Sequence, residues 1–415
     1  MTDAPIYFDA NASSRLRPEI ERVVAELVSP AAPKNPSSVH SSGRLARARL
    51  QAARKSVLRL LNGGPDGISQ RLVFTSGGTE SCNQMILGFL GPLPQLGMAP
   101  GKVVTSAIEH PAVLEPLSLL ERCGWKIIRV RPQRNGIINV DEFVHHVDSG
   151  TALASLMCAN NETGAIQPVR EVATQLRAKG FGGAIVSDCI QAPGKMSFAL
   201  AELFAAGVNA VSISGHKLGA PSGIGALVIN TASSSVCHPY EPLMRGGAQE
   251  QGFRAGTENL LGAIALGAVA DAINRDLESS LKIRRELREL LWHQLSAGGS
   301  EVERITPVDS EDHIRSLSNT LAVRFEGCRA DDLVVALDIE GVAASTGSAC
   351  SSGKQAISHV ISSMGLDDRR AREVIRLSLD WDADAASVTR GAETILAAVN
   401  RMRSCKPIVG AASAA

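Results

Sequence analysis

Short apolar runs alternate with helical patterns along this chain to about residue 230, and this alternation constrains the fold more than any other feature. Apolar runs of strand length recur at 72–75, 103–106, 184–188, 210–214 and 226–229. From Leu45 to Leu61, apolar residues return at three- and four-residue steps, which is typical of an amphipathic helix. Strands that alternate with helices favour a mostly parallel sheet with helices on both faces. We therefore predict an α/β fold.

The last third of the chain predicts a smaller α+β unit. A long Ala- and Leu-rich helical stretch at 258–277 leads into a charged amphipathic helix at 281–295. Further strands are expected at 319–325 and 374–379, and further helices at 330–339 and 385–399. We predict a large domain over 16–260, a small domain from 1–15 and 261–403, and a flexible tail over 404–415.

Composition narrows the range of partners. The chain has 415 residues, 44% of them hydrophobic, and its formal net charge is zero, so neither nucleic-acid nor anionic-membrane binding is indicated. No signal-peptide pattern is recognised at the start, and no run approaches the ~18 apolar residues of a membrane span. The eight cysteines form no CxxC pairs, which favours reduced thiols in the cytoplasm. No His/Cys cluster has zinc spacing, so we expect no metal.

Lys217 is the first candidate for chemistry. It follows the strand 210–214 and precedes the Gly/Pro-rich stretch 218–225. A lysine held between a strand and a glycine-lined turn can reach into a site and form a Schiff base with an aldehyde cofactor. The same pattern also fits a solvated lysine in a surface loop, so the supporting groups decide between the two interpretations.

Three groups would support such a lysine. Asp188 ends an apolar run, where it could pair with a pyridine nitrogen or simply begin a turn. The turn Ser76-Gly77-Gly78-Thr79-Glu80 follows a strand and opens a helix, which suits phosphate binding but is also common in α/β connections. His110 follows another strand and could stack on a ring, carry protons or be structural.

The order and spacing of these segments resemble the cysteine desulfurases, in the fold-type I, class V branch of the pyridoxal-phosphate enzymes. The resemblance runs from residue 6 to about 400 and includes Tyr7-Phe-Asp9-Ala-Asn11-Ala12, Asn35-Pro36-Ser37-Ser38-Val-His40, Phe74–Glu80, Glu109-His110, Asn160-Asn161-Glu162-Thr-Gly164, Asp188–Gln191, Ser214–Lys217, Arg254–Asn259, Ser348-Ala349-Cys350 and Ile375-Arg376-Leu-Ser378. It implies the fold-type I architecture and places pyridoxal 5'-phosphate in the large domain.

The resemblance assigns roles in cofactor binding. Lys217 would hold the cofactor, Asp188 would pair with the pyridine nitrogen and His110 would stack on the ring. The ring's phenolic oxygen would be contacted by Gln191 and Asn161. The phosphate would be bound by Gly78, Thr79, Ser214 and His216. Thr257 would reach the phosphate in the neighbouring subunit, which implies a homodimer.

Two further residues are assigned to the substrate and the sulfur. Arg376 would pair with the carboxylate of L-cysteine, beside Asn161, since a planar guanidinium suits bidentate binding. Cys350 would accept the sulfur as a persulfide while alanine leaves, and a protein could then take the sulfur onward. Small residues surround Cys350 and glycines bracket it, which favours an exposed loop. For the other seven cysteines we expect buried apolar positions.

Other functions also fit these sequence features. The same thiol loop could serve a selenocysteine lyase, and a class V aminotransferase or decarboxylase on another amino acid is a second possibility. A cofactor-binding scaffold without turnover is disfavoured by the presence of Lys217, Asp188, His110, Cys350 and Arg376. Departures from the family pattern are Ala248 where a third glycine is common, Gln251 where a basic residue is usual, and Asp380-Trp381 where Gly-Arg is frequent. The C-terminal segment does not resemble the partner-binding tail of the housekeeping iron–sulfur desulfurases.

Overall fold

The computed structural model describes residues 5–29, 32–64, 69–91, 100–232, 240–297, 299, 301–310, 313–347 and 357–404. The strands are β1 Ile6–Tyr7, β2 Gln70–Thr75, β3 Lys102–Ser106, β4 Lys126–Val130, β5 Thr151–Ser155, β6 Ala184–Asp188, β7 Ala210–Ser214, β8 Gly225–Asn230, β9 Val302–Arg304, β10 Thr320–Phe325, β11 Val342–Ala343 and β12 Val374–Ser378. The α-helices are α1 Glu19–Leu27, α2 Ser41–Leu60, α3 Gly78–Phe89, α4 Pro111–Arg122, α5 Val140–His145, α6 Val169–Ala178, α7 Leu200–Ala205, α8 Leu260–Arg275, α9 Leu277–Ser296, α10 Ala330–Ile339, α11 His359–Ser363, α12 Asp368–Ala371 and α13 Ala385–Ser404. The described residues also include the short 3-10 turns η2 Gly215–Lys217 and η3 Gln249–Gly252.

A seven-stranded sheet carries the larger part of the chain. Its order is β2-β8-β7-β6-β5-β3-β4. The pairs β3–β4, β3–β5, β5–β6 and β6–β7 are parallel, whereas β8 runs antiparallel to both β2 and β7. The predicted α/β class with a mostly parallel sheet is confirmed. The direction of β8 was not anticipated; the connection from β7 to β8, which spans residues 215–224, turns the chain straight back.

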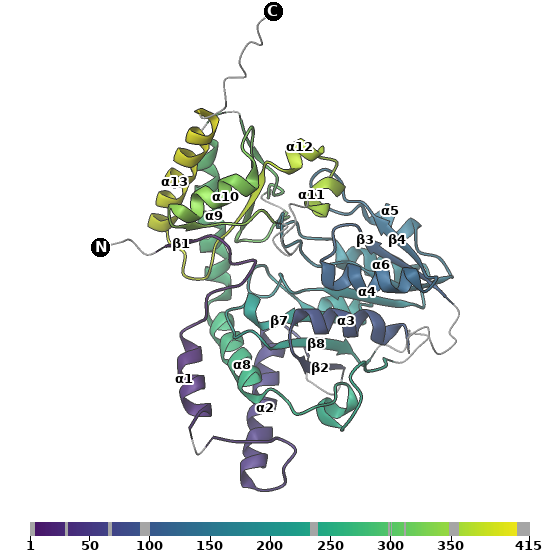
Figure 1. Ribbon diagram of the computed structural model, residues 1–415. Helices are drawn as coiled ribbons and strands as arrows, with labels where there is room; N and C mark the ends of the chain where they lie inside the picture. Colours follow the sequence, from purple (N-terminus) through teal and green to yellow (C-terminus); the bar gives the residue numbers. More distant parts are fainter. Residues whose placement is uncertain are drawn as a thin grey trace, which may run out of the picture.

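Helices cover both faces of this sheet (Figure 1). On one face, α2, α6, α7 and α8 pack into a large apolar cluster with alternate side chains of the strands. On the other face, α3 and α4 pack against the intervening side chains. Since successive strand residues point to opposite faces, a strand covered by helices on both sides buries all of its side chains. This explains why β6 and β7 are buried along their whole length.

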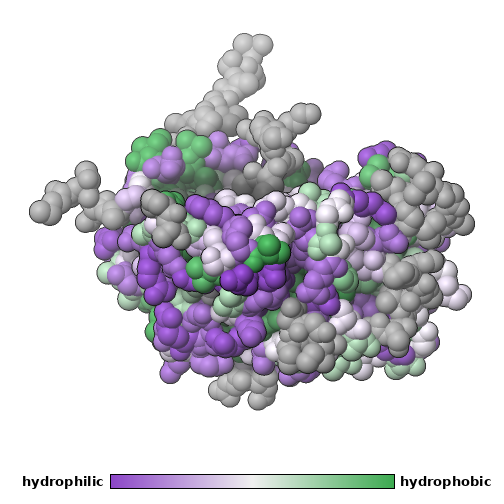
Figure 2. Space-filling view, turned by 90° about the horizontal axis from the view of Figure 1, so that it is seen from below, coloured by the Kyte–Doolittle hydropathy of each residue, from purple (hydrophilic) through white to green (hydrophobic). Residues whose placement is uncertain are grey.

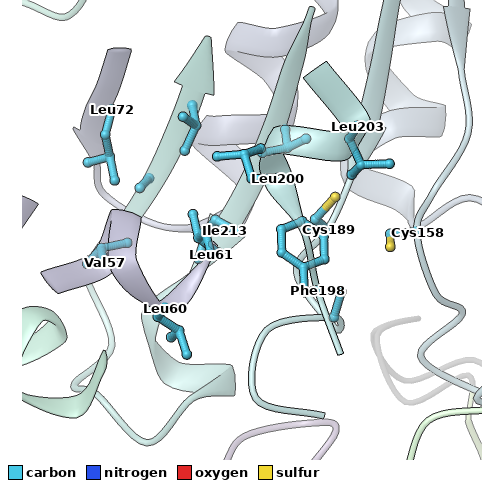
Figure 3. Packing of buried hydrophobic residues seen from close by; sticks show 14 of the residues in the cluster. Val57, Leu60, Leu61, Leu72, Cys158, Cys189, Phe198, Leu200, Leu203 and Ile213 are labelled. Carbon is cyan, nitrogen blue, oxygen red and sulfur yellow. The ribbon is translucent and has the colours of Figure 1, made fainter. Parts of the chain in front are cut away.

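Apolar side chains of α2 meet the sheet in a dense contact region (Figure 3). Val57 and Leu61 of this region are fully buried, as are Leu72 on β2 and Ile213 on β7. Burying each such side chain contributes about 1.5–3 kcal/mol relative to its exposed state. The cluster also holds the sulfur atoms of Cys158 and Cys189. These two cysteines therefore act as small apolar residues.

The helix α8 belongs to the same packing layer. Most of its side chains from Ala263 to Ile273 are buried, and it lies along α2 and α1. Gly267 permits this closeness, because an added Cβ would lie 2.7 Å from the Cα of Ala53. The helix predicted at 258–277 thus contributes to the core beneath the seven-stranded sheet. The division of the chain at residue 260 stays a prediction.

A second, smaller sheet follows α8. It has the antiparallel order β12-β10-β9 and packs with α9, α10 and α13 around its own apolar cluster. Phe8, near the start of the chain, is buried in the same cluster, and β1 pairs with β11. Figure 1 shows these elements gathered at one end of the large sheet. The elements predicted in this part of the chain are present, with helix α13 extending five residues past the expected end at Val399.

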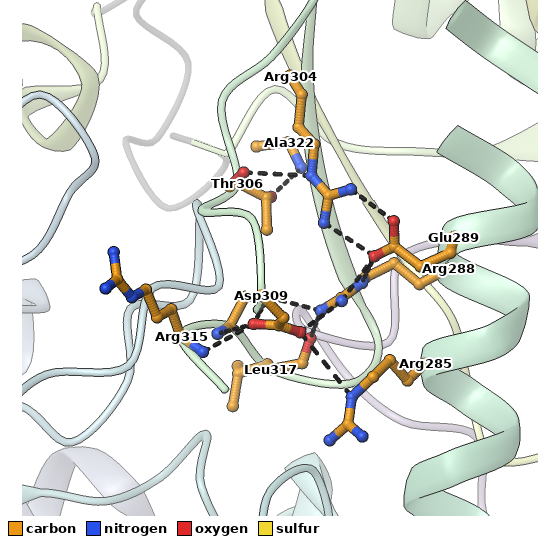
Figure 4. A network of polar contacts seen from close by, with 10 residues as sticks. Arg285, Arg288, Glu289, Arg304, Thr306, Asp309, Arg315, Leu317 and Ala322 are labelled. Carbon is orange, nitrogen blue, oxygen red and sulfur yellow. Dashed lines mark hydrogen bonds and ion pairs between the residues drawn. The ribbon is translucent and has the colours of Figure 1, made fainter. Parts of the chain in front are cut away.

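A buried arginine ties the small sheet to the segment that precedes β10 (Figure 4). Arg288 of α9 is fully buried and donates to Asp309 Oδ2 at 2.8 Å, to Ser316 Oγ at 2.7 Å and to the carbonyl of Leu317 at 2.6 Å. Leu317 N–H in turn donates to the carbonyl of Gly164, in the large unit. Arg288 thus fixes this segment against α9, and the bond from Leu317 fixes it against the loop at Gly164.

The visible surface is of mixed polarity. On the face shown in Figure 2, hydrophilic side chains dominate one side, and the apolar patches among the described residues are small and separate. Single exposed apolar side chains are ordinary on folded proteins. In the described part of the chain, no helix combines the length and the apolar character that a membrane crossing requires.

Candidate active site

A cavity of about 360 Å³ opens at the carboxyl ends of β6 and β7, beside the first turn of α3. Sites of α/β sheets commonly lie at this edge. The predicted site residues that line it are Gly78, Thr79, His110, Asn161, Asp188, Gln191, Ser214, His216, Lys217 and Arg376. They come from segments spread over some three hundred residues of sequence, and the fold brings them together.

A second cavity, of about 500 Å³, is larger. It lies at the amino ends of β5 and β6 and is lined by residues such as Asp148, Lys179 and Phe181. None of the predicted site residues lines it. The smaller cavity is the better candidate because it gathers titratable and polar side chains that converge on one space.

Lys217 enters the cavity from η2, directly after β7. Its Nζ donates to the carbonyl oxygens of Asn11 and Ala12, at 2.7 Å each. The backbone is held on one side by β7 and on the other by the turn, where Leu218 N–H donates to the carbonyl of Gly215. A half-buried amine with a fixed base is suited to covalent chemistry with an aldehyde.

Asp188 is nearly fully buried at the end of β6. Its Oδ1 accepts the N–H of Ile190 at 2.9 Å and the hydroxyl of Ser212 at 3.1 Å. Both bonds fix the orientation of the carboxylate. Gln191 follows three residues later on the same turn and also lines the cavity. A buried, oriented carboxylate can hold a proton on a pyridine nitrogen placed against it.

The start of α3 forms an anion cradle. The first N–H groups of an α-helix have no partners within the helix, and its N-terminus favours negative charge. Gly77, before the helix, has φ 155° and ψ −177°, a conformation reserved for glycine. An added Cβ on Gly78 would lie 2.4 Å from the side chain of Ile190. Ser214 Oγ, buried on the facing strand, has no hydrogen-bond partner among the described residues.

His110 is the N-cap of α4, and Pro111 begins that helix. His110 Nδ1 accepts the N–H of Ala112 at 3.0 Å, which places the proton of the neutral ring on Nε2. Burial lowers the pKa of His110, and the Lys217 ammonium lowers it further, against the opposing effect of Asp188. The pKa of His216 falls to about 4, chiefly through burial and then through Lys217 and Lys195. Both rings are therefore neutral at pH 7.

Arg376 approaches the cavity from β12 of the small sheet. Its guanidinium donates to Asp9 Oδ1 at 2.6 Å and to the carbonyl of Asn161 at 3.2 Å. Its Nε is buried without a hydrogen-bond partner in the described part of the chain. Asp9 thus orients the guanidinium of Arg376, whose side chain lines the cavity and is of the type that binds carboxylates.

Cys350 lies outside the described residues. The chain around it is described up to Gly347, which lines the cavity, and again from Ile357. Ser358, the N-cap of α11, donates its hydroxyl to buried Glu162 at 2.5 Å. An added Cβ on Gly347 would lie 2.8 Å from the same carboxylate. Described residues on both sides of Cys350 therefore lie against the Glu162 carboxylate.

The other cysteines divide into two groups. Cys82, Cys158, Cys189 and Cys328 are buried free thiols, as predicted. Burial raises the pKa of Cys82 and of Cys189 well above the usual thiol range, so neither is a ready nucleophile. The prediction is wrong for Cys123, which is exposed because it follows the last turn of α4. Cys237 and Cys405 lie outside the described residues.

Thr257 does not line the cavity of its own chain. It is exposed, in a segment that begins with two non-glycine residues of positive φ, Glu250 at 44° and Gln251 at 57°. Such residues cost of order 1–3 kcal/mol each. Glu250 pairs with buried Arg54 at 2.9 Å and accepts the N–H of Phe74 at 3.1 Å. These bonds hold the segment in place despite its strain.

Sequence reasoning missed two residues at this site. Asn11 was part of a quoted motif but was given no role, and it lines the cavity. Lys195, in the turn after β6, was not singled out at all, although it is buried directly behind Gln191. A lysine beside glycine and proline carries no local mark of burial, so no sequence signal pointed to it.

These residues fit the pyridoxal 5'-phosphate that the family resemblance implies. The unpartnered Ser214 hydroxyl and the α3 N-terminus suit its phosphate, and Asp188 suits its ring nitrogen. Lys217 can reach its aldehyde from within the same cavity. No group of three or more His, Cys, Asp or Glu that could hold a metal occurs in the described part of the chain.

Comparisons with known proteins agree with this geometry. The family model described as Aminotransferase class-V matches residues 6–390. A cysteine desulfurase of Sinorhizobium fredii is 34% identical over 406 residues, which cover 97% of this chain and 99% of that protein. An IscS-like cysteine desulfurase of Mycobacterium tuberculosis is 34% identical over 372 residues, or 89% and 90% of the two chains. A solved NifS-like protein has a TM-score of 0.83 at 30% identity, covering 96% of this chain and 100% of its own.

Proposed function

The chain belongs to the aminotransferase class-V family and is a pyridoxal-phosphate-dependent cysteine desulfurase, and from this premise we propose which residues perform the reaction. The observation that supports the assignment is the single cavity lined by Lys217, Asp188, His110 and Arg376 together. When bound, the cofactor takes up the electron pair released at the α-carbon of an amino acid.

Each side chain has a distinct part in holding the cofactor. Lys217 would link to the aldehyde, and Asp188 would keep a proton on the ring nitrogen. His110 would stack on the ring as a neutral imidazole, because burial lowers its pKa. The phosphate would be bound by Gly78, Thr79, Ser214 and His216. Gln191 and Asn161 would face the phenolic oxygen.

Lys217 and Arg376 would act on the substrate. Arg376, already oriented by Asp9, would bind the cysteine carboxylate and so fix the α-carbon in the cavity. Lys217 Nζ would then remove the α-proton and return a proton during the reaction, because a positioned amine can serve as both base and acid. The neighbouring carbonyls of Asn11 and Ala12 would hold its ammonium form.

We assign the sulfur transfer to Cys350. Its thiolate would attack the substrate sulfur, the bond from carbon to sulfur would break, and Cys350 would keep the sulfur as a persulfide while alanine leaves. A sulfur-acceptor protein would then receive it. Selenocysteine lyase activity is the second candidate, since the same residues would bind selenocysteine. The free cysteines of the described residues support a reducing, cytoplasmic setting.

We further propose a homodimer in which Thr257 completes the partner's phosphate site. Thr257 is exposed and is not among the residues that line the cavity of its own chain. Exposed apolar side chains accompany its segment: Leu243 at 38%, Met244 at 42% and, on α8, Leu261 at 38%. Ala255 N–H donates to the carbonyl of Met244, so the segment around Thr257 is hydrogen-bonded to the segment that carries these apolar side chains. An apolar surface beside a preformed polar segment suits a symmetric contact.

Asp188→Asn tests the assignment of the ring partner. The amide is nearly isosteric and its oxygen can still accept the N–H of Ile190, so the fold should persist. Without the charge, the ring nitrogen loses its proton, and alanine formation from cysteine should fall at least about a hundredfold. Asp148→Asn, at an exposed carboxylate of the other cavity, serves as the control. Turnover within a few-fold of wild type would assign the role to another carboxylate.

Complementation tests the dimer. Lys217→Ala and Thr257→Glu should each be nearly inactive alone, the second because its carboxylate repels the phosphate. If Thr257 acts across the interface, a mixed dimer of the two variants contains one intact site, and activity should rise well above both parents after mixing and refolding. Sedimentation should show a particle of twice 43.6 kDa. A monomer, or a mixture that stays inactive, would contradict the proposal.

A further inference from the structure

A buried polar layer lies directly behind the cavity. Its centre is Lys195, which is 4% exposed, in the turn between β6 and α7. Lys195 Nζ donates to Gln191 Oε1 and, at 3.1 Å, to Asn11 Oδ1. Both partners line the cavity. Lys195 itself does not line it, so its hydrogen bonds reach the cavity through these two neighbours.

The orientation of both amides is determined. Gln191 Nε2 donates to the carbonyl of Asn11 at 3.1 Å, and Asn11 Nδ2 donates to the carbonyl of Asn161 at 3.1 Å. A backbone carbonyl only accepts, so each amide must turn its nitrogen toward that carbonyl and its oxygen toward Lys195. Gln191 is left with one N–H that can face the cavity.

The same layer reaches Lys217. The carbonyl of Asn11 that accepts from Gln191 also accepts from Lys217 Nζ at 2.7 Å. Lys195 therefore binds the side chain of Asn11, whose carbonyl anchors Lys217, and the side chain of Gln191, which donates to the same carbonyl. On the far side, Ser318 fixes Lys195 through two bonds to its backbone carbonyl, at 3.0 Å from N–H and 2.9 Å from Oγ.

Burying the ammonium group of Lys195 costs free energy. Burial lowers the pKa of its ammonium well below the usual range, and Lys217 and Arg284 act in the same direction while Asp380 opposes them. Its two contacts described above are neutral oxygens, not carboxylates. A buried cation without a carboxylate contact adds little to stability. Its bonds to Gln191 and Asn11 instead point to a role in orienting these two amides.

We propose that Lys195 is a positioning residue of the desulfurase, which directs the free N–H of Gln191 at the phenolic oxygen of the cofactor and holds Asn11 against Lys217. This inference rests on the proposed function of Lys217 and Gln191. A donor to the phenolic oxygen stabilises its anionic form, and so weakens the hold on the proton shared with the linked Lys217 nitrogen. Loss of the donor should strengthen that hold.

The test is the pH titration of the visible absorption band in the reconstituted protein. In Lys195→Met, the pH midpoint of the band should rise by about one unit, a tenfold change in proton affinity. Lys195→Gln, whose neutral amide tolerates burial, is measured in parallel in case the first variant does not fold. Arg284→Met removes another buried cation, one that donates to Gly194 and not to Gln191, and its midpoint should stay near wild type.

A double-mutant cycle separates positioning from the loss of charge. If Lys195 acts mainly through Gln191, the shift caused by Lys195→Met should fall to less than half in a Gln191→Ala background. Equal shifts in both backgrounds, or an unchanged midpoint in folded Lys195→Met, would overturn the inference. A wild-type protein that shows no band with pyridoxal phosphate would instead overturn the role of Lys217.

Discussion

Lys217→Ala should abolish the visible absorption band that pyridoxal phosphate gives on linking to the wild-type protein, and with it the desulfurase activity. The variant loses the only amine assigned to the aldehyde and the base assigned to the α-proton. Proton transfer alone is typically worth 10²–10⁴-fold, and the loss of the covalent link adds to it, so alanine formation should fall by at least about 10⁴. Absorbance after cofactor addition and alanine release measure the two effects.

The Lys217→Ala variant should still bind some pyridoxal phosphate without a covalent link. The α3 N-terminus and Ser214 do not depend on Lys217, so some non-covalent binding should persist and can be followed by dialysis. Lys179→Ala, an exposed lysine of the other cavity, is the matched control and should behave as wild type. If Lys217→Ala kept its visible band, and borohydride reduction followed by digestion placed the reduced cofactor on another lysine, the assignment would be wrong.

Cys350→Ser should uncouple the two halves of the reaction. The variant should still bind cofactor and change its spectrum with cysteine, because those steps use residues of the described cavity. It should form no persulfide and release no sulfide above background, because serine has no thiolate to attack sulfur. Mass spectrometry of the protein after cysteine treatment locates the added sulfur directly.

Cys123→Ser is the matched control for this experiment. Cys123 is an exposed free thiol among the described residues, so a non-specific persulfide would form there. Extra sulfur on Cys123 in the Cys350→Ser protein, with sulfide release retained, would contradict the assignment. Selenocysteine provides a second readout, since selenium can leave without attack by a thiol. Full activity on selenocysteine and none on cysteine would favour the lyase alternative for this variant.

Local patterns predicted most of the elements near the site. The strands β6 and β7 were expected at the residues where they occur, and helix α10 matches its predicted bounds. The positions of these elements can be predicted because each shows the apolar pattern of its own type of secondary structure. The antiparallel direction of β8 could not be read in this way, because an apolar run does not state which way it pairs.

In the candidate site, too, some features follow from local sequence patterns and others only from the tertiary structure. Lys217, Asp188 and the Gly77-Gly78 turn lie at strand ends, where a local pattern marks them, and the structure places them around one cavity. The pairing of Arg376 with Asp9 joins residues 367 positions apart. The exposure of Cys123 also escaped prediction, because it depends on where α4 ends relative to the surface.

The sequence by itself determined the chemistry and the class of fold: an α/β sheet, a lysine and an aspartate at its strand ends, and a glycine turn before a helix. Only the tertiary structure decided how that chemistry is held. Lys195 meets Asn11 across 184 positions, and Asn11 meets Thr320 across 309. Helix and strand periods arise within a few residues and are written locally. Contacts between residues so far apart in sequence depend on how the whole chain packs, so they cannot be predicted from the pattern of any single segment.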